Sequence, residues 1–317
     1  MSRDKERYRE LSDTDSSLPL FMRSWWLDAV SSDGWDIILY EEGGEIMAAM
    51  PYTIHKKLWF RSIIPLPLSP ISGIWIRERK GLSVAKEYSY IERVNEFFAK
   101  EIDDLGIDWL YLHFHHSYTN WLGLYWNGFS QTTRYTYRVL GLEDLDSVFS
   151  KFHQKTRKSI RLAEKELRVI ESIDLDEFYR INAMTFERQG MEVPYSKELV
   201  DKIIEAGKDR NAIMTLAALD ESDNIHSVLM VVFDNEVCYS LIAGSDPNYR
   251  DSGANSLLNW VAMQKTSMLS CKEFDFTGSM IRPIERYMRH FGAIQTPYFA
   301  IEKSYSKLYK LIRDIRK

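Results

Sequence analysis

The chain has 317 residues, of which 45% are hydrophobic and 27% are charged, and its formal net charge at pH 7 is −5. This is the composition of a folded globular protein long enough for two domains. It argues against a membrane-spanning protein, because no apolar run reaches about 18 residues. It also argues against a dedicated nucleic-acid-binding protein, because no segment carries a large basic excess.

The charged start of the chain, MSRDKERYRELSDTD, is unlike a signal peptide, so we expect a cytoplasmic protein. We interpret residues 1–145 as one domain that begins with a polar tail. The patterns then predict a helix at 22–30, strands at 35–40 and 45–54, a proline-rich loop at 65–73, a helix at 84–104, and strands at 107–114 and 131–140.

Residues 146–317 read as a second domain. A helix at 148–167 has one apolar line and a basic stripe, and helices at 176–188 and 196–207 follow. Strands at 212–219, 225–233 and 236–243 are joined by short turns, which predicts an antiparallel meander. We then expect a helix from 254, a strand at 273–276, a helix at 283–290, a strand at 293–301 and a basic helix at 304–317. The predicted fold class is α/β with a mixed sheet.

The turn between the meander and the next helix is the clearest candidate for a binding site. It contains Arg250, Ser252, Gly253, Ala254 and Asn255. The first N–H groups of a helix lack intrahelical partners and favour an anion such as pyrophosphate. The alternative interpretation is an ordinary strand-to-helix turn.

The order of these elements resembles a GNAT acyltransferase domain. Arg250-x-x-Gly253-x-Asn255 is similar to the acyl-CoA pyrophosphate loop of that superfamily, in which Gly or Ala is usual at the position of Asn255. The resemblance implies that Arg250, Ser252, Gly253, Ala254 and Asn255 bind acetyl-CoA or another acyl-CoA.

Three further segments resemble the FemAB-like and BioF2-like branch of the GNAT superfamily. They are residues 152–165, residues 185–190, and residues 274–279 followed by Phe291-Gly292-Ala293. Proteins of this branch are built from two tandem GNAT-like domains. The resemblance therefore implies that residues 1–145 are a degenerate GNAT-like domain, that residues 146–317 hold the donor site, and that the acceptor pocket lies where the domains meet.

Five other residues are candidates for catalysis or substrate binding. Asp275 lies in a short strand, where Asp is rare, and is either a general base or a structural carboxylate that holds the loop after it. Tyr298 lies near the place where GNAT enzymes often have a tyrosine that protonates the leaving thiolate, and a simple packing role is the alternative. Arg157, Arg188 and Arg282 are candidates for binding an anionic acceptor, or are solvated surface charges.

We expect no metal site. The motif His113-x-His115-His116 has no cysteine or carboxylate cluster beside it. Cys238 and Cys271 lie in apolar segments and are interpreted as buried small hydrophobic residues.

The leading hypothesis is an acyl-CoA-dependent N-acyltransferase that transfers a small acyl group to the amine of an amino sugar or amino acid. The acceptor amine attacks the thioester directly, so the protein mainly orients and deprotonates it. The first alternative is a FemAB-type aminoacyl-tRNA-dependent peptidoglycan transferase, and only this alternative involves tRNA. The second is a non-catalytic binding protein with the same fold. We expect no DNA partner, and the sequence leaves the oligomeric state open.

Overall fold

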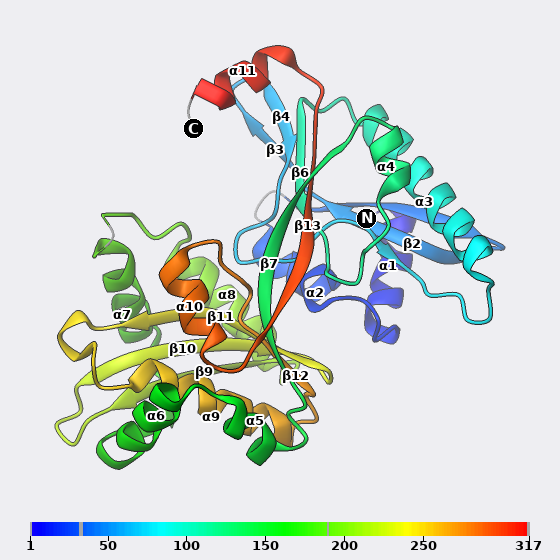
Figure 1. Ribbon diagram of the computed structural model, residues 1–317. Helices are drawn as coiled ribbons and strands as arrows, with labels where there is room; N and C mark the ends of the chain where they lie inside the picture. The colour runs from blue at the N-terminus through cyan, green and yellow to red at the C-terminus, as the bar shows by residue number, and fades with distance from the viewer. Residues whose placement is uncertain (1, 32–33, 189, 316–317) are drawn as a thin grey trace. The chain divides into compact units, whose positions relative to one another are not determined.

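The computed structural model describes residues 2–31, 34–188 and 190–315 (Figure 1). It forms two compact units. Unit 1 contains the described residues up to Arg134 together with those from Pro297 onward, and unit 2 is Tyr135–Thr296. The sequence instead suggests a boundary at 145/146 and assigns the last residues to the second domain. The difference arises because the division falls inside two long strands, β7 (Ser130–Leu140) and β13 (Ile294–Ser304), where no turn signal marks it.

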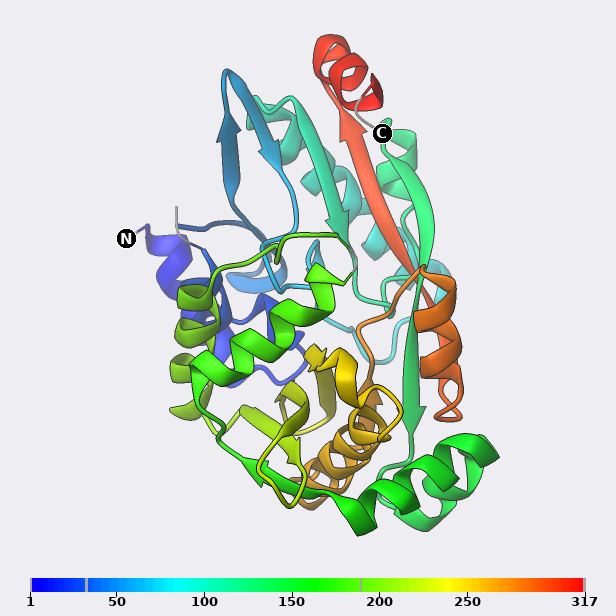
Figure 2. The same cartoon turned by 90° about the vertical axis from the view of Figure 1, so that its left-hand side faces the viewer.

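Unit 1 contains two groups of strands and several helices. Its elements, besides parts of β7 and β13, are α1 (Arg3–Thr14), η1 (Leu20–Met22), α2 (Ser24–Val30), β1 (Asp36–Glu42), β2 (Glu45–Tyr52), β3 (Ile54–Lys57), β4 (Phe60–Ile63), β5 (Trp75–Ile76), α3 (Val84–Asp104), β6 (Trp109–His113), α4 (Leu122–Trp126) and α11 (Lys307–Ile315). One sheet has the order β1-β2-β5, and β3, β4, β6 and β13 are successive neighbours in another. The β3–β4 hairpin is the blue pair of strands in Figure 2.

The core of unit 1 joins α3 to the strands around it. Val94 and Phe98 of α3 pack with Leu110 and Leu112 of β6 and with Ile301 of β13, and all five side chains are almost fully buried. The pairing of β13 with β6 runs from Ala300↔His113 to Ser304↔Trp109. A strand near the end of the chain therefore completes the core of the first unit.

The start of the chain corrects one prediction. Residues 3–14 form helix α1 rather than a polar tail, and Ser2 caps it by accepting from the Lys5 N–H. Tyr8 is fully buried, and its hydroxyl donates to the carbonyl of Met22. Two apolar residues, Tyr8 and Leu11, are enough to anchor this helix, and the charged residues between them conceal the pattern. At the other end, residues 316 and 317 of the predicted basic helix lie outside the described residues.

Unit 2 has a sheet covered by helices. Its elements are α5 (Leu145–Lys151), α6 (Gln154–Glu166), β8 (Arg168–Glu171), α7 (Leu175–Glu187), α8 (Lys197–Lys208), β9 (Ile213–Leu219), β10 (Ile225–Phe233), β11 (Val237–Ser245), η2 (Pro247–Tyr249), α9 (Ala254–Met268), β12 (Glu273–Asp275) and α10 (Arg282–Arg289). The strand order is β7-β12-β11-β10-β9-β8. Strands β9, β10 and β11 are antiparallel, which confirms the predicted meander, and β11 pairs with β12 in parallel.

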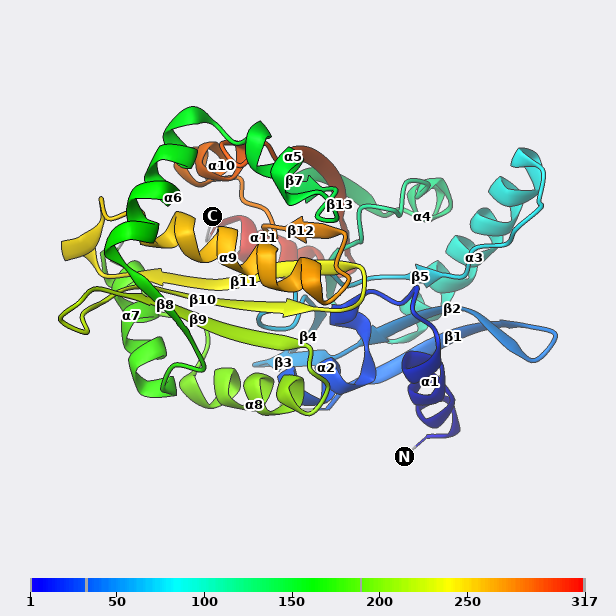
Figure 3. The same cartoon turned by 90° about the horizontal axis from the view of Figure 1, so that it is seen from below.

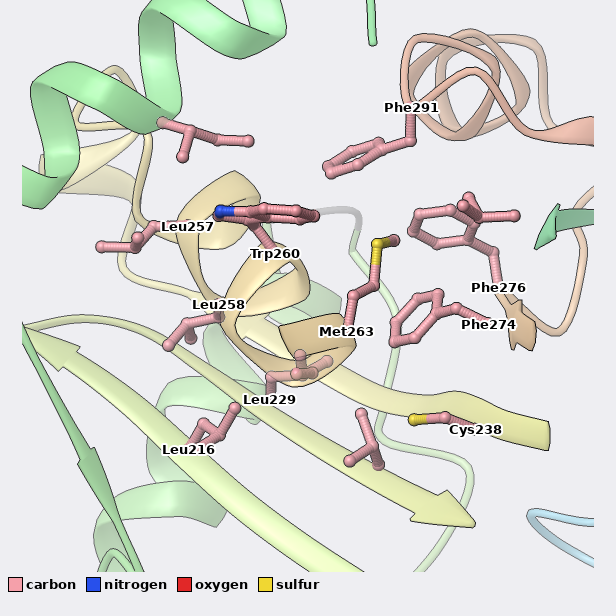
Figure 4. Packing of buried hydrophobic residues seen from close by; sticks show 14 of the residues in the cluster. Leu216, Leu229, Cys238, Leu257, Leu258, Trp260, Met263, Phe274, Phe276 and Phe291 are labelled. Carbon is pink, nitrogen blue, oxygen red and sulfur yellow. The ribbon is translucent and has the colours of Figure 1, made fainter. Parts of the chain in front are cut away.

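Helices lie on both faces of this sheet. Figure 3 shows α6 and α9 on one face and α7 and α8 on the other. This explains why every residue of β10 after Ile225 is buried. On the α9 face, Trp260 and Met263 pack with Phe274 and Phe291 in the main core (Figure 4). The structure divides the helix predicted at 148–167 into α5 and α6, because Phe152 is extended and His153 caps the second helix.

Candidate functional site

The site lies at a fork between two parallel strands of unit 2. Strands β11 and β12 pair from Val237↔Glu273 to Tyr239↔Asp275. Beyond Tyr239, β11 continues to Ser245 without a β12 partner, because β12 ends at Asp275. On its other side β11 has an extra residue opposite β10, at Leu241. Such a bulge bends a strand and turns it away from its neighbour, so the two strands separate at Ser240.

Helix α9 begins just beyond the fork. Its N-cap is Gly253, with φ +79°, and the Ser252 hydroxyl accepts from the Ala254 N–H at 3.3 Å. In the described part of the chain, the N–H groups of Asn255 and Ser256 have no protein acceptor. Two N–H groups at the positive end of a 15-residue helix therefore remain for an anion.

Gly253 also has a packing role. A Cβ at this position would lie 2.6 Å from the Ser159 hydroxyl oxygen and 2.8 Å from the Ser159 carbonyl oxygen of α6. Only glycine permits both this close approach and the positive φ. The absence of a side chain at Gly253 thus allows the start of α9 to pack closely against α6.

A cluster of polar side chains connects the fork to the start of α9. We call Ser240, Asn255, Asn259, Thr277 and Tyr287 the fork cluster. The Asn259 amide nitrogen lies 2.9 Å from the Asn255 carbonyl oxygen and 3.2 Å from the Tyr287 hydroxyl oxygen. The Ser240 hydroxyl donates to Asn259 Oδ1 at 3.3 Å, and the Thr277 hydroxyl donates to the Ser240 carbonyl at 3.1 Å.

The fork cluster explains the unusual Asn255. Its Oδ1 lies 3.2 Å from the amide nitrogen of Asn259, one helical turn later. Asn259 is 2% exposed, so its polar groups need these partners. Sequence reasoning missed Ser240, Asn259, Thr277 and Tyr287. The available signal was a second Asn four residues after Asn255, between the apolar residues Leu258 and Trp260.

Asp275 is buried at the end of β12. It accepts hydrogen bonds from the Thr136 hydroxyl and, at 2.7 Å, from the Thr277 N–H. Burial raises the pKa of this carboxyl to about 6, although both hydrogen bonds lower it. These contacts are those of a carboxylate that holds the following loop, and the pKa places its titration near neutral pH.

The other candidate residues have no hydrogen bond to the fork cluster among those that the structure describes. Tyr298 belongs to unit 1, where its ring lies 5.7 Å from that of His113. On α6, Arg157 donates to the Ser150 carbonyl at 2.6 Å. Arg188 ends α7, next to residue 189, which lies outside the described residues, and Arg282 begins α10. Arg188, Arg250 and Arg282 are all exposed.

Helix α7 contacts the unpaired edge of β11. The Asn182 amide donates to the Ala243 carbonyl at 3.1 Å, and the Ser245 N–H donates to the Thr185 hydroxyl at 3.2 Å. These bonds satisfy groups near the end of β11, and the Thr277 hydroxyl already occupies the Ser240 carbonyl, so Leu241 is the part of the edge that remains beside the fork. A ligand that pairs with β11 would therefore bind next to the fork cluster.

Two further predictions concern cysteines and metals. Cys238 and Cys271 are free and buried, as predicted. Over residues 2–31, 34–188 and 190–315, no group of three or more His, Cys, Asp or Glu side chains is placed to hold a metal ion. His113 instead lies 3.1 Å from the Tyr111 hydroxyl, and burial lowers its pKa to about 4.

Known proteins resemble this chain in sequence and in fold. Residues 150–289 match the family model described as an acetyltransferase (GNAT) domain. The fold is similar to that of FemX, with 14% identity, 94% of this chain and 96% of that chain covered, and a TM-score of 0.71. It is also similar to L-PGS from Bacillus licheniformis, with 12% identity, coverage of 98% and 96%, and a TM-score of 0.57.

A third similar structure is a tandem GNAT protein from the clavulanic acid biosynthesis pathway. It is 10% identical, with 86% of this chain and 83% of that chain covered and a TM-score of 0.50. None of the curated proteins matches the sequence. At such identities the structural likenesses concern the fold.

Residues 150–289 of unit 2 therefore match a GNAT acyltransferase domain, and the class of enzyme that this domain defines is a transferase. More specifically, the chain has the GNAT fold in its FemAB-like form, with a mixed α/β architecture and tandem GNAT-like domains. This confirms the fold and class that the sequence motifs predict.

Proposed function

We propose that the protein is an acyl-CoA-dependent N-acyltransferase that transfers a small acyl group to an amine, such as that of an amino sugar or amino acid. The observation that carries this proposal is the fork between β11 and β12, which lies beside a helix start with two N–H groups free for an anion. A thioester donor with a pyrophosphate needs both features. The extended pantetheine pairs with a strand edge, and the phosphates bind at a helix N-terminus.

The donor would lie along the fork. Its pyrophosphate would accept from the N–H groups of Asn255 and Ser256, with Arg250 as the adjacent positive charge and Ser252, Gly253 and Ala254 forming the turn. Its pantetheine amides would pair with β11 near Leu241, where β12 no longer occupies the edge. The thioester would then lie near the fork cluster.

The chemistry needs one proton removed from the acceptor and one delivered to the leaving group. The amine nitrogen attacks the thioester carbonyl carbon, a C–N bond forms, and the C–S bond breaks. We assign Tyr287 as the group that protonates the thiolate, since its hydroxyl belongs to the fork cluster. Tyr298 is the other candidate for this step, but it belongs to unit 1.

Asp275 is the proposed proton acceptor, either directly or by placing Thr277. A carboxylate with a pKa of about 6 is mostly ionised at pH 7 and is a stronger base than an ordinary Asp. If it accepts the proton, Asp275→Asn lowers kcat by about 100-fold or more at unchanged KM. If it only places Thr277, the same change alters KM as well, because the fork loosens. Arg157, Arg188 and Arg282 remain proposed contacts for an anionic acceptor.

Calorimetric titration with acetyl-CoA tests the donor site. Arg250 is exposed and carries no ion pair within the described ranges, so Arg250→Ala removes charge without disturbing packing. We expect it to weaken binding about tenfold, as lost charge-assisted contacts do. The matched control is Lys202→Ala, on α8 across the sheet, which should bind like the wild type. Absence of binding by the wild type, or equal loss in both variants, would contradict the proposal.

One observation favours a second candidate function. The outward face of α6 carries Lys155, Arg157, Lys158, Arg161 and Lys165, and among the residues that the structure describes none of them pairs with an acid. Such a surface suits a polyanionic donor, as a FemAB-type aminoacyl-tRNA-dependent peptidoglycan transferase would need. Binding of tRNA that falls steeply with salt, together with no binding of acetyl-CoA, would favour this candidate. Binding of acetyl-CoA without transfer to any amine would favour a non-catalytic binding protein.

A further inference from the structure

The tip of the β3–β4 hairpin in unit 1 exposes two large apolar side chains. Leu58 is 79% exposed and Trp59 is 77% exposed. They are the two residues between the paired Lys57 and Phe60, so they form the turn itself. Single exposed apolar residues are common on proteins, but Leu-Trp at the point of a hairpin is a concentrated apolar feature.

Folding does not require these residues at this turn. Leu58 has φ +58°, a conformation that favours Gly or Asn and is costly for Leu. Of the two turn residues only Leu58 has positive φ, as in a type II′ hairpin turn, and that turn normally has Gly at its first central position. The chain thus keeps two bulky apolar residues where a polar turn would be more stable, and such strain is typical of functional positions.

Helix α11 lies beside this hairpin. The Phe60 and Tyr309 rings are 4.9 Å apart, and the Trp109 and Tyr309 rings are 5.7 Å apart. These contacts hold one side of α11 against β4 and β6. The opposite side exposes Leu308 and Leu311, which are 57% and 59% exposed and lie three residues apart. Figure 2 shows the blue hairpin and the red helix at the same end of unit 1.

Lysines border this apolar surface. Lys56 and Lys57 precede the hairpin tip, and Lys307 and Lys310 lie on the first turns of α11. Among the described residues, none of these four lysines has an ion pair. The neighbouring cations Lys303 and Arg313 are instead neutralised by Asp103 and Glu302. The positive charge that no acid neutralises therefore lies next to the exposed leucines and tryptophan.

We propose that this surface, formed by residues 56–59 and the exposed side of α11, binds the headgroup region of an anionic lipid bilayer. Apolar side chains that enter the interface, flanked by lysines that contact anionic headgroups, are the two components of peripheral membrane binding. Trp is favoured at that depth. Three of the four exposed apolar side chains are leucines, which cannot stack on bases, so a bilayer fits better than RNA.

The surface would lie on the membrane rather than cross it. Throughout the described ranges, no helix is long and apolar enough to span a bilayer. This inference is independent of the donor site and of the proposed function, because all of its residues belong to unit 1.

Vesicle flotation of the full chain tests the proposal. At about 0.15 M salt, we expect the wild type to float with vesicles of phosphatidylcholine containing about one third phosphatidylglycerol, and to float weakly with phosphatidylcholine alone. The double variant Leu58→Gly, Trp59→Asn should lower the partition coefficient at least about tenfold. Its new turn has Gly at the one position with positive φ, so the variant should fold at least as well as the wild type.

Two further variants complete the test. Lys307→Gln with Lys310→Gln should weaken the preference for anionic vesicles at least about tenfold, while Lys56 and Lys57 retain part of it. Trp126→Ser removes a tryptophan that is 58% exposed on α4 and should leave flotation unchanged. The proposal is overturned if the wild type does not float with anionic vesicles, or if the Leu58 and Trp59 variant floats like the wild type. Retention by tRNA through the same lysines, without flotation, would assign the surface to RNA instead.

Discussion

The carboxyl group of Asp275 makes a structural hydrogen bond and also has a raised pKa. Its carboxylate holds the Thr277 N–H, and burial raises its pKa from 3.8 to about 6. A raised pKa means that the folded state binds the proton more tightly than the unfolded chain does. The stability that this residue contributes is therefore complete below about pH 4 and is lost as pH rises through about 6.

The substitution Asp275→Asn tests this linkage. A difference of about two pKa units corresponds to about 3 kcal/mol, so the variant should gain stability over the wild type by an amount of this order between pH 4 and pH 7. Urea unfolding followed at several pH values measures the difference. A pH-independent difference between the two proteins would show that Asp275 titrates normally.

The site was partly predictable from individual residues. Gly253 was recognisable because a positive φ or a close approach at a helix start calls for glycine, and the structure contains both. Tyr287 and Thr277 were not, because their roles depend on Ser240 and Asn259, which lie on other elements. A hydrogen bond between elements has no periodicity that a single sequence reveals.

At the scale of elements, the contact of α9 with α6 depends on a single missing side chain. Gly253→Ala adds a methyl group within 2.8 Å of the Ser159 carbonyl and places Ala at φ +79°. We expect a loss of about 2–5 kcal/mol in the free energy of unfolding, from backbone strain and overpacking together. Chemical denaturation followed by circular dichroism measures this loss.

Gly81 provides a matched control. It has the same φ of +79°, but a Cβ there meets nothing within 4 Å. Gly81→Ala should therefore lower the free energy of unfolding by only about 1–2 kcal/mol, because it adds backbone strain without a clash. Equal losses of unfolding free energy in the two variants would mean that the close contact of Gly253 with α6 does not contribute to the loss. The crowding at Ser159 also makes large substitutions at Gly253 unsuitable for testing donor binding.

Elements with a strong hydrophobic periodicity were predictable from the sequence, and elements held by few contacts were not. The helix predicted at 84–104 and the strand predicted at 225–233 coincide with α3 and β10, because each has a continuous buried face. Helix α1 was missed because only Tyr8 and Leu11 anchor it. The short strands β3, β4 and β8 were missed because their pairing partners are distant in the sequence or their side chains are partly exposed.

At the scale of the whole molecule, the discontinuity of unit 1 has a measurable consequence. Ile301 of β13 is fully buried in the core of unit 1 and lies opposite Leu112 of β6. Ile301→Ala should lower the free energy of unfolding by about 2–5 kcal/mol. Hydrogen exchange followed by mass spectrometry should show faster exchange in peptides of β6 and α3 than in the wild type, with peptides of β9 and β10 little changed.

The mirror-image control is Phe274→Ala, which removes a fully buried ring from the core of unit 2. This variant should speed exchange in β9 and β10 more than in β6. If both variants affect the two units equally, the molecule unfolds as a single cooperative body, and the division at Arg134 and Pro297 has no energetic meaning.

The place of β13 also sets an order of events during synthesis. Domains generally form from the N-terminus as the chain emerges from the ribosome. Here all of unit 2 emerges before residues 300–304, whose pairing with β6 belongs to unit 1. Most of unit 1 is made before unit 2, yet one edge of β6 stays unpaired until residues 300–304 have emerged. A nascent chain of this protein is thus open to misassociation at β6 until β13 has emerged.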